Sequence, residues 1–219
     1  LFQPTSQEKD IVTRVNTGGT DNPTNAQHEE SHWRTTLTVM SIAQYLSGIG
    51  FSIIFPFLPF YFRELGLKTD QEVLLWMGYI GLAFGITMGF SAPIWGLVAD
   101  RYGRKLMVIR SMTAGAVVLG LMGLATSPWH IFFLRIFQGM TTGTVTASVT
   151  MVSSVTPAAQ LGLSLGILQT ALLLGNVIGP LAGGILADWF GYRIPCGIAF
   201  VVLMAGTVLV IFGSHERFT

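Results

Sequence analysis

Long apolar runs dominate this sequence from residue 37 onward and limit the folds open to it. A helix rises about 1.5 Å per residue and the hydrocarbon core of a bilayer is about 30 Å thick, so an apolar run of about 18 or more residues is typical of a transmembrane helix. Charged residues make up only 11% of the chain, against about 25% in soluble domains, and cannot cover a water-facing surface. The sequence therefore predicts an all-α integral membrane protein with six transmembrane helices, at residues 37–62, 73–99, 106–126, 129–152, 161–187 and 193–213.

The apolar runs divide the chain into three segments. Residues 1–33 are polar and partly acidic and contain no apolar core, which predicts a disordered cytoplasmic tail without a signal peptide. Residues 34–214 make up the predicted six-helix transmembrane domain, and residues 215–219 begin a cytoplasmic linker. Because the sequence starts at Leu1 and stops soon after an apolar run, we expect it to be part of a longer protein.

Basic residues predict the orientation of the helices. Arg101, Arg104 and Lys105 lie in the connection between the second and third runs, and Lys and Arg favour the cytoplasmic side of a membrane. An even number of spans then places both termini in the cytoplasm. We expect a multi-pass protein of the cell membrane.

A ten-residue pattern occurs twice, at the ends of the second and fifth runs. Gly, Ala, Asp and Gly recur with a constant offset of 88 residues, as Gly96, Ala99, Asp100 and Gly103 and then as Gly184, Ala187, Asp188 and Gly191. Three helices separate the two copies, and an odd number places the copies on opposite faces of the membrane. The sequence therefore predicts two inverted three-helix repeats, a building pattern of transporters.

Polar side chains inside the apolar runs are the candidates for a transport route. Arg135 lies roughly 10 Å from the end of its run by helical rise, where an unpaired charge usually marks a pathway or a partner. A structural ion pair is the alternative. Gln44, Gln169 and Asn176 are amides in apolar helices, and Thr142 shares the predicted face of Arg135 with Gly139, Thr146 and Thr150. Either a binding cavity or hydrogen bonds between helices explain such residues.

The fifth run carries a strip of glycines. Gly175, Gly179 and Gly183 are four residues apart, which permits close backbone approach to a neighbouring helix. Pro180 removes one helical hydrogen bond and predicts a kink beside this strip. The strip is explained either by a bend point for a conformational change or by tight packing alone.

Four segments resemble sequence motifs of the major facilitator superfamily, and they occur along the chain in the order expected for that family. The segment between the second and third runs resembles its loop signature, with Gly96, Asp100, Arg101, Gly103, Arg104 and Lys105. Residues 50–59 resemble the first-helix motif of drug exporters, and Arg135 through Gly139 resemble the Arg-x-x-Gln-Gly motif of the fourth helix. Residues 175–184 resemble the antiporter motif, which includes Gly175, Gly179, Pro180, Gly183 and Gly184. The likeness extends from about residue 37 to the end of the chain and is strongest to the drug/proton antiporters that confer multidrug resistance.

The resemblance implies the N-terminal half of a proton-coupled exporter that works by alternating access. It implies that Arg135 takes part in proton coupling and that the 96–105 loop gates the cytoplasmic side. We expect Gln44, Thr142, Gln169 and Asn176 to line the substrate route. The expected partners are a small-molecule substrate, protons, membrane lipid and a second six-helix half, with no nucleic acid. The alternative is a non-transporting membrane scaffold or partner subunit in which the same residues only pack helices.

Other functional classes lack their residues. No phosphate-binding Gly-x-x-x-x-Gly-Lys-Ser/Thr loop occurs, and the four histidines show neither a metal-ligand nor a catalytic-triad pattern, so we expect no cofactor, no metal and no enzyme activity. No Asp or Glu lies in the middle of a predicted span, although proton-coupled exporters often use one. The sequence therefore does not identify the group that carries the proton.

Overall fold

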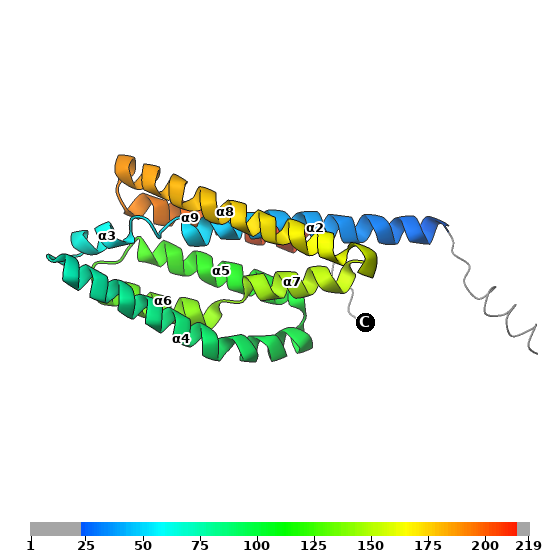
Figure 1. The fold of residues 1–219 in the computed structure, drawn as a ribbon, viewed down its shortest axis with the longest axis horizontal. Coiled ribbons are helices and arrows are strands. Elements are labelled where there is room, and N and C mark those ends of the chain that lie inside the picture. Colours follow the sequence, from blue (N-terminus) through cyan, green and yellow to red (C-terminus); the bar gives the residue numbers. More distant parts are fainter. Residues whose placement is uncertain (1–22, 214–219) are drawn as a thin grey trace, which may run out of the picture.

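Helices are the only regular secondary structure in the part of the chain that the structure describes. The structure, a computed structural model, describes the backbone of residues 23–213 and the side chains of residues 33–99 and 101–213. Its elements are α2 (Pro23–Ser52), α3 (Leu58–Glu64), α4 (Asp70–Tyr102), α5 (Arg104–Met122), α6 (Pro128–Thr141), α7 (Thr144–Val155), the 3₁₀ turn η1 (Ala158–Gln160), α8 (Leu161–Phe190) and α9 (Arg193–Gly213). Figure 1 shows these helices running along the long axis of the molecule. The all-helical prediction is confirmed for this part of the chain.

Four of the described helical segments are long and apolar enough to cross a membrane. They are Asp70–Ala99, Arg104–Met122, Ala158–Phe190 and Arg193–Gly213, which correspond to the second, third, fifth and sixth predicted spans. The first predicted span, 37–62, is divided between α2 and α3, and the fourth, 129–152, between α6 and α7. With 14 and 12 residues, α6 and α7 are each shorter than the roughly 20 residues that a single spanning helix needs. Six spans therefore stay a prediction.

The structure describes only part of the predicted N-terminal tail and does not describe the predicted C-terminal linker. α2 begins at Pro23, so the helix extends into the segment that the sequence predicts as a disordered tail. Residues 1–22 and 214–219, which hold the rest of that tail and the predicted linker, lie outside the described residues.

Both breaks in the predicted helices have a local cause. Between α2 and α3, Pro56 has no N–H to donate and disfavours helical backbone at Phe55. Between α6 and α7, Thr142 is extended with ψ 153°. Gly143 follows with φ +155°, a backbone conformation that residues other than glycine rarely adopt. The predicted single polar face through Arg135, Thr142 and Thr150 is therefore wrong, because the helix is interrupted in the middle of it.

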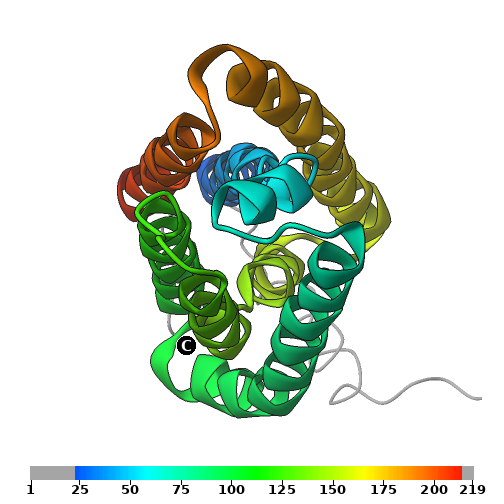
Figure 2. The same ribbon diagram turned by 90° about the vertical axis from the view of Figure 1, so that its left-hand side faces the viewer.

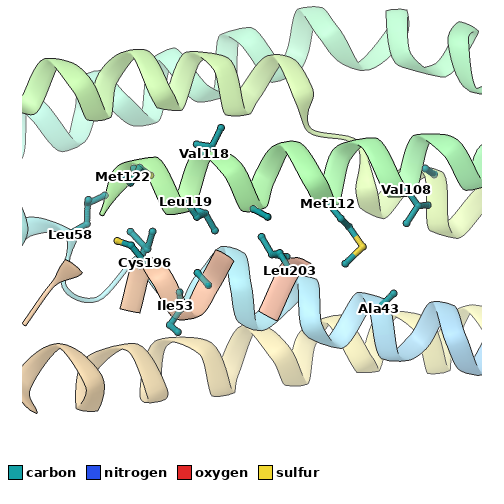
Figure 3. Close-up of a cluster of buried hydrophobic side chains, with 14 of the residues drawn as sticks. Ala43, Ile53, Leu58, Val108, Met112, Val118, Leu119, Met122, Cys196 and Leu203 are labelled. Atoms are coloured by element: carbon teal, nitrogen blue, oxygen red, sulfur yellow. The ribbon is translucent and has the colours of Figure 1, made fainter. Parts of the chain in front are cut away.

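The helices surround a core that α2, α5 and α9 share. α2 packs against α8 and α9, α4 against α6, and α5 against both α9 and α7, and the end-on view of Figure 2 shows α2 and α7 inside a ring of the other helices. Figure 3 shows Met112, Leu119, Cys196 and Leu203 pointing toward one another between α5 and α9, beside α2. The outward faces are also apolar, and Phe90, Leu97 and Phe212 are each at least 75% exposed. Large apolar side chains on the outside suit contact with lipid rather than water.

The two copies of the repeated pattern end their helices in the same way. Gly103 follows α4 with φ +95° and Gly191 follows α8 with φ +80°. The N–H of each glycine donates to the carbonyl of the alanine four residues before it, at 3.1 Å to Ala99 and 2.9 Å to Ala187. Figure 1 places the α4–α5 connection at one end of the molecule and the α8–α9 connection at the other.

Candidate functional site

The glycine strip of α8 lies directly against α2. A Cβ on Gly175 would lie 2.9 Å from the Cα of Gly48, and a Cβ on Gly179 or Gly183 would overlap Ser52 Oγ or the Ile53 carbonyl oxygen. Ser52 Oγ also donates to the Gly175 carbonyl at 3.4 Å. The close backbone approach that the glycine spacing predicts is therefore present.

The other members of the predicted antiporter motif lie apart from that contact. A Cβ on Gly184 would meet nothing within 4 Å, so this glycine faces away from α2. Pro180 is half-buried beside the strip, and α8 continues through it from Leu161 to Phe190.

Two cations of the predicted gate loop bind carbonyl groups on separate helices. Arg104 Nη1 donates to the Thr150 carbonyl on α7 at 3.1 Å, and Lys105 Nζ donates to the Ile211 carbonyl on α9 at 2.8 Å. The Ile211 carbonyl is among the last four of α9, which have no partner within the helix. Adjacent residues at the start of α5 therefore hold α7 and α9.

The remaining described loop residues differ in exposure, since Gly96 and Arg101 are exposed and Gly103 is buried. Arg101 is exposed, with its guanidinium carbon 6.0 Å from the Tyr102 ring centroid, and Gly96 has open space where a Cβ would lie. Gly103 forms the turn into α5. The side chain of Asp100 lies outside the described ones, so the structure leaves its predicted part in the loop untested.

Arg135 is a buried cation with only part of its hydrogen-bonding capacity used. Its side chain is 5% exposed on α6, and its Nη1 donates to Gln138 Oε1 at 3.1 Å. The guanidinium carbon lies 5.5 Å from the ring centroid of Phe55, in the break between α2 and α3. Nε and Nη2 have no hydrogen-bond partner among the described residues. Two groups of the guanidinium therefore have unused donors, and a carboxylate is the acceptor that suits a guanidinium best.

The end of α6, just after Arg135, is held by side chains of α4. Because α6 stops at Thr141, its last carbonyls have no partner within the helix. Ser91 Oγ donates to the Gly139 carbonyl at 2.9 Å and Trp95 Nε1 to the Met140 carbonyl at 2.6 Å. The Thr142 hydroxyl donates to the Gln138 carbonyl at 2.8 Å.

Ser91 and Trp95 are functional candidates that the sequence analysis missed. The four-residue spacing of Thr87, Ser91 and Trp95 places them on one face of α4, and this spacing was the available signal. Arg110 of α5 also contacts Trp95, with its guanidinium carbon 3.3 Å from the indole ring centroid, a cation–π contact. α4, α5 and the α6–α7 break therefore meet at Trp95.

The four residues predicted to line a substrate route do not share one surface. Gln169 and Asn176 are both exposed on α8. Thr142 is half-buried in the break between α6 and α7. Gln44 is fully buried inside the described helices, with both amide atoms unpartnered. Among the described side chains, no group of three His, Cys, Asp or Glu residues is placed to hold a metal ion.

Comparisons with known proteins agree on one family. Residues 40–217 match the family model described as Major Facilitator Superfamily. The chain is 39% identical over 198 residues to Multidrug resistance protein MdtG of Proteus mirabilis, covering 89% of this chain and 48% of the relative. It is 40% identical over 190 residues to the protein of the same name from Citrobacter koseri, covering 85% and 46%. The chain thus spans about half the length of the curated relatives it matches.

A solved structure shares the fold. The crystal structure of the human organic anion transporter MFSD10 (TETRAN) superposes with a TM-score of 0.73 at 19% sequence identity, covering 84% of this chain and 48% of that one.

Proposed function

Since this chain belongs to the Major Facilitator Superfamily, we propose that it is the N-terminal half of a secondary transporter that exports drugs or other small molecules in exchange for protons. It is a multi-pass membrane protein, with apolar helices of spanning length. Its similarity to multidrug resistance proteins over 85% or more of its length supports the class of substrate. The proposed location is the cell membrane, with both termini in the cytoplasm.

The chain length and the helix arrangement support half of a carrier. The chain matches 48% of the Proteus mirabilis relative, which leaves room for a second six-helix domain. We assign one three-helix unit to α2/α3, α4 and α5 and the other to α6/α7, α8 and α9. Two observations favour their inverted relation: the matching Gly103 and Gly191 turns lie at opposite ends of the molecule, and the α2–α8 contact has its counterpart in the α6–α4 contact.

Alternating access requires that this half rock as a body against the second one. The α2–α8 contact supports a rigid body, since glycine and backbone atoms meet there without flexible side chains between them. Arg104 and Lys105 add links from α5 to α7 and α9 at the end that we assign to the cytoplasm. Gln169 and Asn176 lie on an exposed face of α8 and are the better candidates for the substrate route.

The partly satisfied guanidinium of Arg135 is the observation that carries proton coupling. Taking a charge into the membrane costs at least about 2.5 kcal/mol, so such a charge is kept where it binds a partner or modulates a pathway. We propose that Arg135 Nε and Nη2 bind a carboxylate that gains and loses the transported proton. That carboxylate belongs to the second half or to a loop edge, since the predicted spans of this chain hold no Asp or Glu.

The test uses the complete protein in membrane vesicles with an imposed proton gradient and a panel of cationic and neutral dyes. Arg135→Ala is expected to abolish proton-driven efflux while the amount of inserted protein stays unchanged. Arg63→Ala serves as the matched control, because Arg63 is exposed and pairs with Asp70 at the surface. Undiminished efflux by the Arg135→Ala variant would refute the coupling role. A complete protein that moves no dye under any gradient would favour the scaffold alternative.

A further inference from the structure

A buried polar site lies within α2, at Gln44. This side chain is 0% exposed, and neither Oε1 nor Nε2 has a hydrogen-bond partner among the described residues. Leaving a buried amide unpaired is unfavourable, so most such groups in proteins are satisfied by protein or by ordered water. We propose that the interface between α2 and α7 holds ordered water bound to Gln44 and Ser148.

The neighbours of Gln44 define where its side chain points. One turn further along α2, Gly48 lies against Gly175 of α8, and two turns further, Phe51 covers Gly115 of α5. Gln44 thus faces the angle between α8 and α5. α7 packs against α2, α5 and α8, which places it in the region between α5 and α8 that Gln44 faces. Figure 2 shows α7 beside α2 at the centre of the molecule.

α7 presents a second unpartnered polar group to this interface. Its Thr144 hydroxyl is 2.7 Å from the Ser111 hydroxyl of α5, which fixes the direction of this face of α7. Ser148 follows one turn later, is 0% exposed, and has no hydrogen-bond partner for Oγ among the described residues. On α2, the hydroxyls of Ser41 and Ser47 are likewise buried without partners, three residues on either side of Gln44. Two helices in contact therefore each bring unpaired polar groups.

The chemistry of these groups identifies water as the ligand. Gln44 offers two N–H donors and one acceptor, and each serine hydroxyl offers both a donor and acceptors. A cation would satisfy only the oxygen atoms and leave Gln44 Nε2 unpaired. Water donates and accepts, and a buried water typically makes about three hydrogen bonds. Ala43, Ala147 and Ser148 are small buried side chains, which limit how far the interface can be filled by the protein itself.

The first test is a double-mutant cycle on thermal unfolding of the complete protein in detergent. Gln44→Met keeps the side-chain volume and removes the amide, and Ser148→Ala removes the hydroxyl. With water bound, each substitution is expected to lower Tm by about 2–4 °C, and the double variant by less than the sum, since both groups bind the same water. Gln169→Met is the matched control, because Gln169 is exposed on α8, and is expected to leave Tm unchanged.

Two outcomes of this cycle would overturn the proposal. A dry interface predicts that Gln44→Met raises Tm, because it removes an unpaired buried amide. Additive effects of the two substitutions would show that Gln44 and Ser148 share no ligand.

A second measurement distinguishes water from a cation and is independent of export. Density within about 3 Å of both Gln44 Oε1 and Nε2 in a structure that resolves water would support the assignment, provided that it disappears in the Gln44→Met variant. Tm is expected to be the same in sodium and in choline buffers of equal ionic strength. A Tm that rises with sodium in the unsubstituted protein but not in Gln44→Met would assign the site to the cation instead.

Discussion

The α2–α8 contact leaves no room for a side chain at the glycines of α8 that face α2. Gly183 and Gly184, which are adjacent but face different surroundings, allow a test of this close packing. A Cβ at Gly183 would overlap the backbone carbonyl of Ile53, which cannot move without shifting α2, whereas Gly184 faces open space. We expect Gly183→Val to destabilise the complete protein by about 1–3 kcal/mol, or a fall in Tm of about 2–12 °C. Gly184→Val adds the same side chain to the same helix and is expected to leave Tm within about 1 °C. Equal Tm values for the two variants would mean that the helices do not approach as closely as described.

At the scale of helices, the start of α5 holds the end of another helix in place. Lys105 Nζ binds the Ile211 carbonyl in the last turn of α9, where a cation also interacts favourably with the helix dipole, by about 0.3–1 kcal/mol. Lys105→Ala is therefore expected to speed hydrogen exchange of the amides in the last turn of α9 roughly two- to fivefold. Arg101→Ala is the matched control, since Arg101 is exposed beside Tyr102. Identical exchange in the two variants would contradict this capping.

The sequence predicts helices of spanning length well and their interruptions poorly. Apolar runs define the uninterrupted helices α4, α5, α8 and α9, and the structure confirms them as helices near the predicted bounds. The break at Gly143 was missed, because one extended threonine and one positive-φ glycine leave the apolar run unchanged. Pro56 carried a signal for the first break, since proline removes a helical donor.

The candidate site was also only partly predictable from the sequence. The four-residue spacing of glycines in α8 predicted a close helix contact, which the structure contains. The partner helix was not predictable, because it depends on how distant segments pack. For the same reason, the sequence could not predict that Gln44 is buried while Gln169 and Asn176 are exposed. All three are amides within apolar runs, and the runs do not show which side of each helix packs against another.

For the whole molecule, the proposed inverted repeat requires that the two glycine turns face opposite sides of the membrane. Arg101 and Trp189 occupy equivalent positions of the repeat, and both are exposed. Cys196, the one cysteine of this sequence, is buried and is replaced by alanine for this test, together with any cysteine of the second half. A membrane-impermeant thiol reagent is expected to label Arg101→Cys only from the cytoplasmic side and Trp189→Cys only from the opposite side. Labelling of both from one side would refute the inverted arrangement.

The two-residue break at Thr142 and Gly143 has a mechanical consequence for the whole molecule. The end of α6 is bonded to Ser91 and Trp95 of α4, whereas α7 is bonded to α5 through Thr144 and Ser111. The two segments of one predicted span are therefore bonded by side chains to different helices, although α5 packs against both. A change in the angle between α4 and α5 would be taken up at this break, where Gly143 has φ +155°. The span is therefore interrupted close to Arg135, and in the proposed carrier its two segments would adjust to different helices while the glycine-lined α2–α8 contact stays fixed.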